Sequence, residues 1–155
     1  MNTIWAPWRA EYIVGAKAQG CIFCDAHKAG DRLLITEGAT CLAIMNRFPY
    51  TTGHCLIAPK RHLGDVTALS VEESAEMDSL MKALVTAIRK IMNPDGFNIG
   101  MNIGAVAGAG IEDHLHLHIV PRWKGDTNFL PVISEVHLVS QHLETTLAKI
   151  KEALG

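Results

Sequence analysis

The sequence predicts an α+β fold in which an antiparallel sheet of about five strands packs against one long central helix and a C-terminal helix. Three observations predict it: an amphipathic run in the middle of the chain, short β-like runs on either side, and turn sequences between the runs. The order lacks the regular strand–helix alternation of a doubly wound parallel sheet. At 155 residues the chain is expected to form a single domain, residues 1–155.

The central helix is predicted to begin after Ser70. Ser70 followed three residues later by Glu73 is the pattern of a capping box. Asn93-Pro94 should end the helix, because the residue before a proline avoids the helical region. Apolar residues recur between these signals at helical spacing: Met77, Leu80, Met81, Leu84, Ile88 and Ile91. A second helix is predicted near residues 140–154, with Leu143, Leu147, Ile150 and Leu154 on one stripe.

The β-like runs are predicted as strands at residues 41–45, 54–59, 97–102 and 114–120. The stretches RFPYTTGH and PDG supply turn chemistry between them. Cys41 and Cys55 fall inside strand runs, where packing is their expected role.

Composition excludes several classes of protein. The formal net charge of −2 offers no general attraction to DNA or RNA. The first residues lack the pattern of a signal peptide, and no apolar stretch approaches the roughly 20 residues of a membrane-spanning helix. We therefore expect a cytoplasmic protein without a membrane or nucleic-acid partner, whose four cysteines stay reduced and serve in metal binding or packing.

The run DHLHLHIVPRW carries the strongest functional signal. In a strand, alternate side chains share a face, so three histidines should line one face: His114, His116 and His118. The intervening Leu115, Leu117 and Ile119 should then point into the core. Such a face suits a nucleophile flanked by groups that orient it and shuttle protons. The alternatives are an exposed histidine-rich face, or three ligands of one metal, although only neighbouring rungs of a strand converge on one ion.

HLHLHIV resembles the His-φ-His-φ-His-φ-φ signature (φ apolar) of the histidine-triad (HIT) family, and IMNRFPYTTGHCLIAPKRH resembles the segment upstream of it. The resemblance covers about residues 21–123 in the family's order. WAPWR, CIFC and HIVPRWKGDTNF are similar to the bacterial branch related to FHIT, which includes diadenosine tetraphosphate phosphorylases.

The resemblance implies that His116 attacks the α-phosphate of a nucleotide and forms a nucleotidyl-imidazole intermediate. His118 would contact phosphate oxygens or the departing group, and His54 would orient or polarise the site, unless it is only a turn residue facing solvent. We expect the His116 ring to stand exposed beside the other two rings, with its lone pair aimed into a cleft.

The resemblance also suggests residues that bind the substrate. Asn46 would hold the ribose hydroxyls, with an ordinary turn residue as the alternative; Ile44 would line the base pocket, and the Asn102 amide would reach the phosphates. In GAVAGAG, glycines such as Gly108 and Gly110 can present backbone N–H groups to an anion, although a flexible connector is the usual role of such a run.

One segment departs from the family. Ala109-Gly110-Ile111 stands where a Gly-Gln-Ser/Thr run is common, so side-chain donors expected near the leaving group are missing and the preferred acceptor is open. Arg122 can meet polyphosphate, and Trp123 can stack on a base or fill a dimer interface. Packing is the expected role of Trp5 and Trp8.

Cys21 and Cys24 have the spacing of a metal-ligand pair. One pair alone is ambiguous, and two reduced packing cysteines are the alternative. The resemblance supplies the completion, with His62 and His114 forming a Cys₂His₂ set for a structural zinc ion that braces the fold and fixes His114 beside the nucleophile.

The expected function is a nucleotidyl hydrolase or phosphorylase acting on dinucleoside polyphosphates, with inorganic phosphate or water as acceptor. The family resemblance suggests a homodimer, to which one helix face can contribute. Three alternatives stay open: a HINT-type hydrolase of adenosine phosphoramidates or aminoacyl-adenylates, a nucleotide-binding signalling module with little turnover, and a zinc-braced interaction domain.

Overall fold

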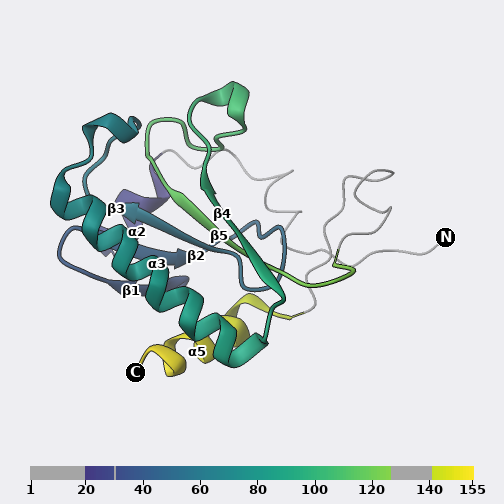
Figure 1. The fold of residues 1–155 in the computed structure, drawn as a ribbon. Helices are drawn as coiled ribbons and strands as arrows, with labels where there is room; N and C mark the ends of the chain where they lie inside the picture. The colour runs from purple at the N-terminus through teal and green to yellow at the C-terminus, as the bar shows by residue number, and fades with distance from the viewer. Residues whose placement is uncertain (1–19, 30, 127–140) are drawn as a thin grey trace.

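The computed structural model describes residues 20–29, 31–126 and 141–155, which form a five-stranded antiparallel sheet with helices on both of its faces (Figure 1). The strands are β1 (Leu34–Glu37), β2 (Cys41–Met45), β3 (Cys55–Pro59), β4 (Gly96–Met101) and β5 (Leu117–Arg122). Their order in the sheet is β1-β2-β3-β5-β4, and every neighbouring pair is antiparallel. The predicted fold class is thus confirmed.

The helices are α2 (Ile22–Ala29), α3 (Val71–Met92) and α5 (Leu143–Leu154), with short 3₁₀ turns at Val66–Ala68 and Ala105–Ala107. Ser70 and Glu73 form the capping box at the start of α3, as predicted. Asn93, in the left-handed conformation before Pro94, ends the helix. The C-terminal helix begins at Leu143, and residue 140 lies outside the described residues.

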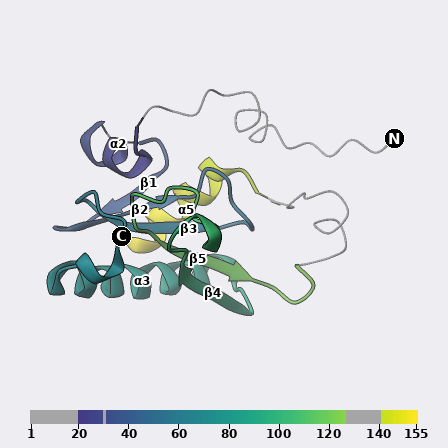
Figure 2. The same ribbon diagram turned by 90° about the horizontal axis from the view of Figure 1, so that it is seen from above.

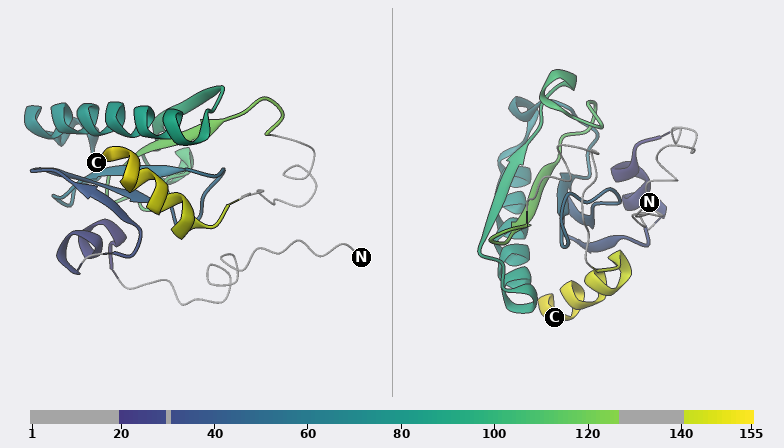
Figure 3. Two further views of the ribbon diagram at one scale, coloured as in Figure 1. Left: turned by 90° about the horizontal axis from the view of Figure 1, so that it is seen from below. Right: turned by 90° about the vertical axis from the view of Figure 1, so that its right-hand side faces the viewer.

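Both faces of the central strands are buried. Alternate residues of β2 and β3 pack on α3 and α5 in the main core, and the remaining ones, Leu42, Ile44, Leu56 and Ala58, pack on Phe23 and Ala26 of α2. Figure 2 and the left view of Figure 3 show α2 and α3 on opposite sides of the sheet. This two-sided burial explains why both strands are buried along their whole length.

Two elements were not predicted, and one strand begins later than expected. Strand β1 and helix α2 were not predicted from the sequence, and Cys24 lies in that helix. The last strand begins at Leu117, so His114 and His116 precede it in the chain. Leu115 and Ile119 are buried as predicted, and Leu117 packs at the edge of the main core. Trp5 and Trp8 lie outside the described residues.

Of the helices that the structure describes, none combines the length and apolar character needed to cross a membrane.

Candidate functional site

The rings of His116 and His118 lie side by side at the start of β5, with centroids 4.9 Å apart. The expectation that His116 stands exposed is wrong: the residue is only 5% exposed. The cause is Phe23 of α2, whose ring lies 5.1 Å from that of His116. His116 is therefore surrounded by aromatic rings and lies beside His118. The His114 ring instead faces the two cysteines.

The hydrogen bonds of His116 fix its tautomer. Its Nδ1 lies 2.8 Å from the carbonyl oxygen of His114. Because a carbonyl oxygen can only accept, Nδ1 carries the proton and Nε2 keeps its lone pair. Burial lowers the pKa of His116 below its usual value, which favours the neutral ring at pH 7. His116 thus presents an unprotonated nitrogen, the form that a nucleophile needs.

A hydrogen bond joins His54 to His118, and its donor and acceptor can be assigned. The backbone N–H of Tyr50 donates to His54 Nδ1 at 3.1 Å, and His54 Nε2 lies 2.9 Å from His118 Nδ1. Since Nδ1 of a neutral His54 accepts, its Nε2–H donates to His118, which leaves the proton of His118 on Nε2. That Nε2 is buried and has no hydrogen-bond partner among the described residues. A buried, unpartnered donor beside a lone pair suits a phosphate oxygen.

The same pair is held neutral. Burial, followed by repulsion from His118 and His116, lowers the pKa of His54 to about 3. Burial, followed by repulsion from His116, lowers the pKa of His118 to about 4. His54 is completely buried, so the alternative of a turn residue facing solvent is excluded. The tautomers deduced above therefore apply near neutral pH.

The residues expected to bind substrate lie in three places: at the end of β2, in the loop after β4, and at the end of β5. Ile44 is buried in the apolar cluster between the sheet and α2. The Asn46 carboxamide accepts from the backbone N–H of Phe48 at 2.9 Å, and its Nδ2 faces His54 at 3.3 Å. Asn46 therefore both closes the turn and contacts the histidine pair.

The glycine loop and the end of β5 hold the remaining candidates. Asn102 Nδ2 donates to the carbonyl of Gly108 at 3.3 Å, and Gly110 is exposed. Arg122 makes a bidentate ion pair with Asp126 and also donates to Asn98, while the Trp123 indole donates to the carbonyl of Met92 at 3.4 Å. Arg122 shares the sheet face of His118, because the two residues are four apart on one strand.

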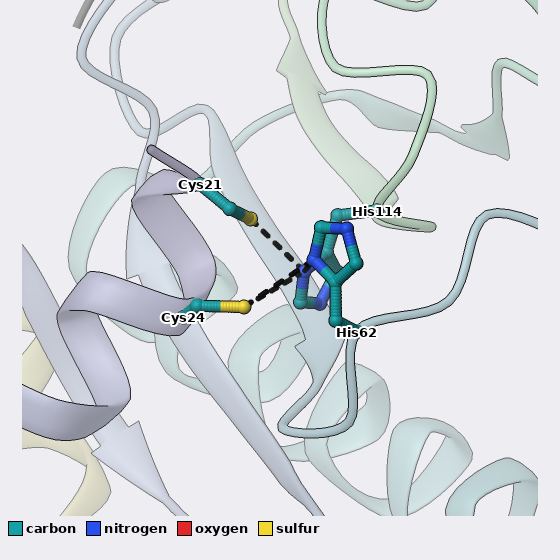
Figure 4. Close-up of side chains that lie close together, drawn as sticks. All are labelled: Cys21, Cys24, His62 and His114. Atoms are coloured by element: carbon teal, nitrogen blue, oxygen red, sulfur yellow. Dashed lines mark hydrogen bonds between the residues drawn. The ribbon is translucent and has the colours of Figure 1, made fainter. Parts of the chain in front are cut away.

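Four potential metal ligands converge at the other end of the histidine row: Cys21, Cys24, His62 and His114 (Figure 4). His114 Nδ1 lies 3.0 Å from Cys21 Sγ, 3.7 Å from Cys24 Sγ and 3.2 Å from His62 Nδ1. Cys24 Sγ lies 3.4 Å from His62 Nδ1. A tetrahedral zinc site has ligand–ligand edges of about 3.3 Å for two nitrogens and about 3.5 Å for nitrogen and sulfur, so the cluster has the size of such a site.

The donor set also has the chemistry of a metal site. His114 Nε2 donates to the carbonyl of Pro59 at 2.8 Å, so the lone pair is on Nδ1, which faces the cysteines. The segment that carries His62 is fixed next to this group, because Leu115 N donates to Leu63 O at 2.6 Å. A Cβ atom on Gly64 would lie 2.6 Å from the Glu112 carbonyl oxygen, so only glycine permits this approach.

Three contributors were missed from the sequence. Phe23 contacts two histidines, the Tyr50 backbone sets the tautomer of His54, and Glu73 holds Arg61 next to His62 through two hydrogen bonds of 3.0 and 2.8 Å. The position of Phe23 between two cysteines with the spacing of metal ligands was a usable signal. The other two depend on tertiary geometry.

Comparisons with known proteins agree with this geometry. The model of the family described as HIT domain matches residues 28–125. A protein of Mycobacterium tuberculosis called AP-4-A phosphorylase is 31% identical over 157 residues, which cover 94% of this chain and 80% of the relative. The adenosine 5'-monophosphoramidase of Schizosaccharomyces pombe is 36% identical over 104 residues, 66% of this chain and 74% of that protein. Among solved structures, a zinc-bound histidine triad family protein from Mycobacterium smegmatis superposes with a TM-score of 0.70 at 29% identity, covering 86% of this chain and 92% of that one.

Proposed function

Because this chain belongs to the HIT domain family, we propose that it is a nucleotidyl transferase or hydrolase that cleaves dinucleoside polyphosphates of the diadenosine tetraphosphate type through an intermediate on His116. The observation that carries the proposal is the pairing of opposite tautomers. His116 offers a lone pair on Nε2, and the adjacent His118 offers a buried N–H with no other partner among the described residues. A phosphate group bound between them would meet a nucleophile and a donor together.

The reaction has two displacements. His116 Nε2 attacks the α-phosphorus, a P–N bond forms, and the P–O bond to the remaining polyphosphate breaks, with its electron pair leaving on that oxygen. The His114 carbonyl, bonded to Nδ1–H, stabilises the positive charge that develops on the ring. Phosphate or water then attacks the same phosphorus and restores His116.

His118 and His54 act on the departing side. The His118 Nε2–H donates to an oxygen of the reacting phosphate or of the leaving group. His54 is a positioning residue, since its bond to His118 Nδ1 keeps the His118 proton on the nitrogen that faces the substrate. Donors of this kind, already oriented before the reaction, contribute about 10²- to 10³-fold to a rate.

We propose that Cys21, Cys24, His62 and His114 hold a structural zinc ion. A zinc-bound relative with the same fold and the size of the cluster support this assignment. Zinc bound by four protein ligands supplies rigidity, because no coordination position is left for an activated water. The proposed catalytic residues His116 and His118, and the positioning residue His54, are not members of this cluster.

A second activity has specific support. One relative is named as a monophosphoramidase, and the loop at Ala109-Gly110-Ile111 lacks side-chain donors that would select a leaving group. The test is to incubate the protein with diadenosine tetraphosphate and with an adenosine phosphoramidate, each with and without inorganic phosphate. Phosphorolysis gives ADP and ATP from the tetraphosphate only when phosphate is present, and hydrolysis gives AMP and ATP in either buffer. Turnover of the phosphoramidate alone would overturn the proposed substrate class.

We also propose that the protein is a homodimer in the cytoplasm. Within the described residues β4 pairs only with β5, so its outer edge is available to a second copy, and Ile99 on this strand is exposed. Light scattering coupled to size-exclusion chromatography tests the dimer, and a monomeric mass at micromolar concentration would contradict it.

A further inference from the structure

Phe23 lies between the metal cluster (the four candidate ligands Cys21, Cys24, His62 and His114) and His116. Its ring contacts His114 of the cluster and His116. Its ring centroid is 4.9 Å from that of His114 and 5.1 Å from that of His116, with interplanar angles of 44° and 34°. The side chain is completely buried.

The position of Phe23 depends on the metal ligands beside it. The residue stands between Cys21 and Cys24 at the start of α2, a helix of eight residues. Isolated helices this short are unstable in water. The helix is seated on the sheet by Phe23 and Ala26, which pack against the apolar cluster of β2 and β3. An ion that joins both cysteines to His62 and His114 would therefore fix where the Phe23 ring lies.

Phe23 in turn limits how the His116 ring can lie. Nδ1 is bonded to the His114 carbonyl, Phe23 packs against the ring, and His118 lies 4.9 Å away. Without the Phe23 ring, the His116 imidazole would gain room to rotate, and Nε2 would spend less time beside the His118 donor. Even small displacements of a reacting atom lower rates strongly.

We propose that Phe23 is a positioning residue that transmits occupancy of the metal cluster to the orientation of the His116 ring. This inference rests on the proposed function, in which His116 is the nucleophile. Occupancy of a metal site that never touches the substrate would then set the rate of nucleotidyl transfer.

The test compares Phe23→Leu with a matched control, Leu42→Ala. Leucine fills much of the apolar volume but has no flat ring to hold the imidazole. Leu42 is also completely buried in the same cluster and lies on β2, so its truncation disturbs the packing without removing Phe23. Four quantities are measured for each protein: zinc per chain, the single-turnover rate of nucleotidyl-enzyme formation, the steady-state KM, and the tautomer of His116 by ¹⁵N NMR.

We expect Phe23→Leu to retain one zinc per chain and to keep KM within about twofold, while the single-turnover rate falls by about tenfold to a hundredfold. Its NMR spectrum should show a mixture of His116 tautomers in place of the Nδ1–H form. Leu42→Ala should keep the wild-type rate and tautomer. Stripping zinc with a chelator should slow the wild type strongly and slow Phe23→Leu much less, because both perturbations disturb the same contact between Phe23 and His116.

A zinc-loaded Phe23→Leu protein with the wild-type rate and a single His116 tautomer would overturn the inference, as would a Leu42→Ala protein that is slowed equally. The inference would also be overturned if zinc removal slowed Phe23→Leu by the same factor as it slows the wild type. These results are distinct from failure of the proposed function, which would show as normal turnover by His116→Ala.

Discussion

The hydrogen-bonded pair of His54 and His118 makes the stability of the protein depend on pH in a way that one substitution can isolate. Burial is the main cause that lowers the pKa of His54 from 6.5 to about 3. Below pH 6.5 the unfolded chain binds a proton at this residue and the folded protein does not. The stability that neutral His54 contributes is therefore complete above about pH 6.5 and is lost as the pH falls toward 3.

His54→Gln removes the titrating ring and keeps a polar side chain of similar length. Each pH unit between 6.5 and the folded-state pKa corresponds to about 1.4 kcal/mol, so at pH 4 the wild type should have lost about 3 kcal/mol more than the variant. Urea unfolding followed by circular dichroism, at pH 7, 6, 5 and 4, measures both free energies. Any pH effect that is common to the two proteins cancels in their difference.

The predicted result is that the stability difference between wild type and His54→Gln closes steadily as the pH falls. Two parallel curves of unfolding free energy against pH would contradict this prediction, because they would mean that His54 has an ordinary pKa in the folded protein. In that case the tautomer of His118 would not be fixed either.

Two further substitutions test the framework of the site. Glu76→Gln should lower the unfolding free energy by about 2 kcal/mol at pH 7. The Thr40 hydroxyl and the backbone N–H groups of residues 39–41 donate to the Glu76 carboxylate and lower its pKa to about 2. The effect of the substitution should therefore shrink as the pH falls from 4.5 toward 2, and urea titrations that show no loss of stability at pH 7 would contradict it. Gly64→Ala should weaken zinc binding by about tenfold or more and lower the unfolding free energy by about 1–3 kcal/mol, because the added Cβ would meet the Glu112 carbonyl oxygen. A competition titration with a chromogenic chelator measures the zinc affinity, and a wild-type value would contradict this prediction.

The elements with strong local signals could be predicted from the sequence. Ser70 and Glu73 at one end and Asn93-Pro94 at the other define α3, because caps and proline act through neighbouring residues. Strand β1 was missed because it is four residues long with an irregular register against β2. Helix α2 was missed because eight residues give little periodicity, and the helix depends on tertiary packing.

The sequence predicted which residues lie close together, and it did not predict their surroundings. Alternation in HLHLHIV, together with the family resemblance, identified the histidine row, and the resemblance extended the cysteine pair to a cluster of four candidate ligands. The burial of His116 depends on Phe23, which is distant in the sequence and reaches the ring through the placement of α2. Arg122, expected to meet polyphosphate, is bonded to Asp126 and Asn98, partners that a single sequence does not identify.

The central claim, that His116 becomes covalently nucleotidylated, is tested most directly by trapping the intermediate. Diadenosine tetraphosphate labelled at the α-phosphorus is mixed with enzyme, and the reaction is quenched in alkali, which preserves P–N bonds, before mass spectrometry of the peptides. We expect one adenylyl group per active site on the peptide that contains His116, formed at least as fast as turnover, and none in His116→Ala. Turnover without any adduct, or an adduct on another residue, would contradict it.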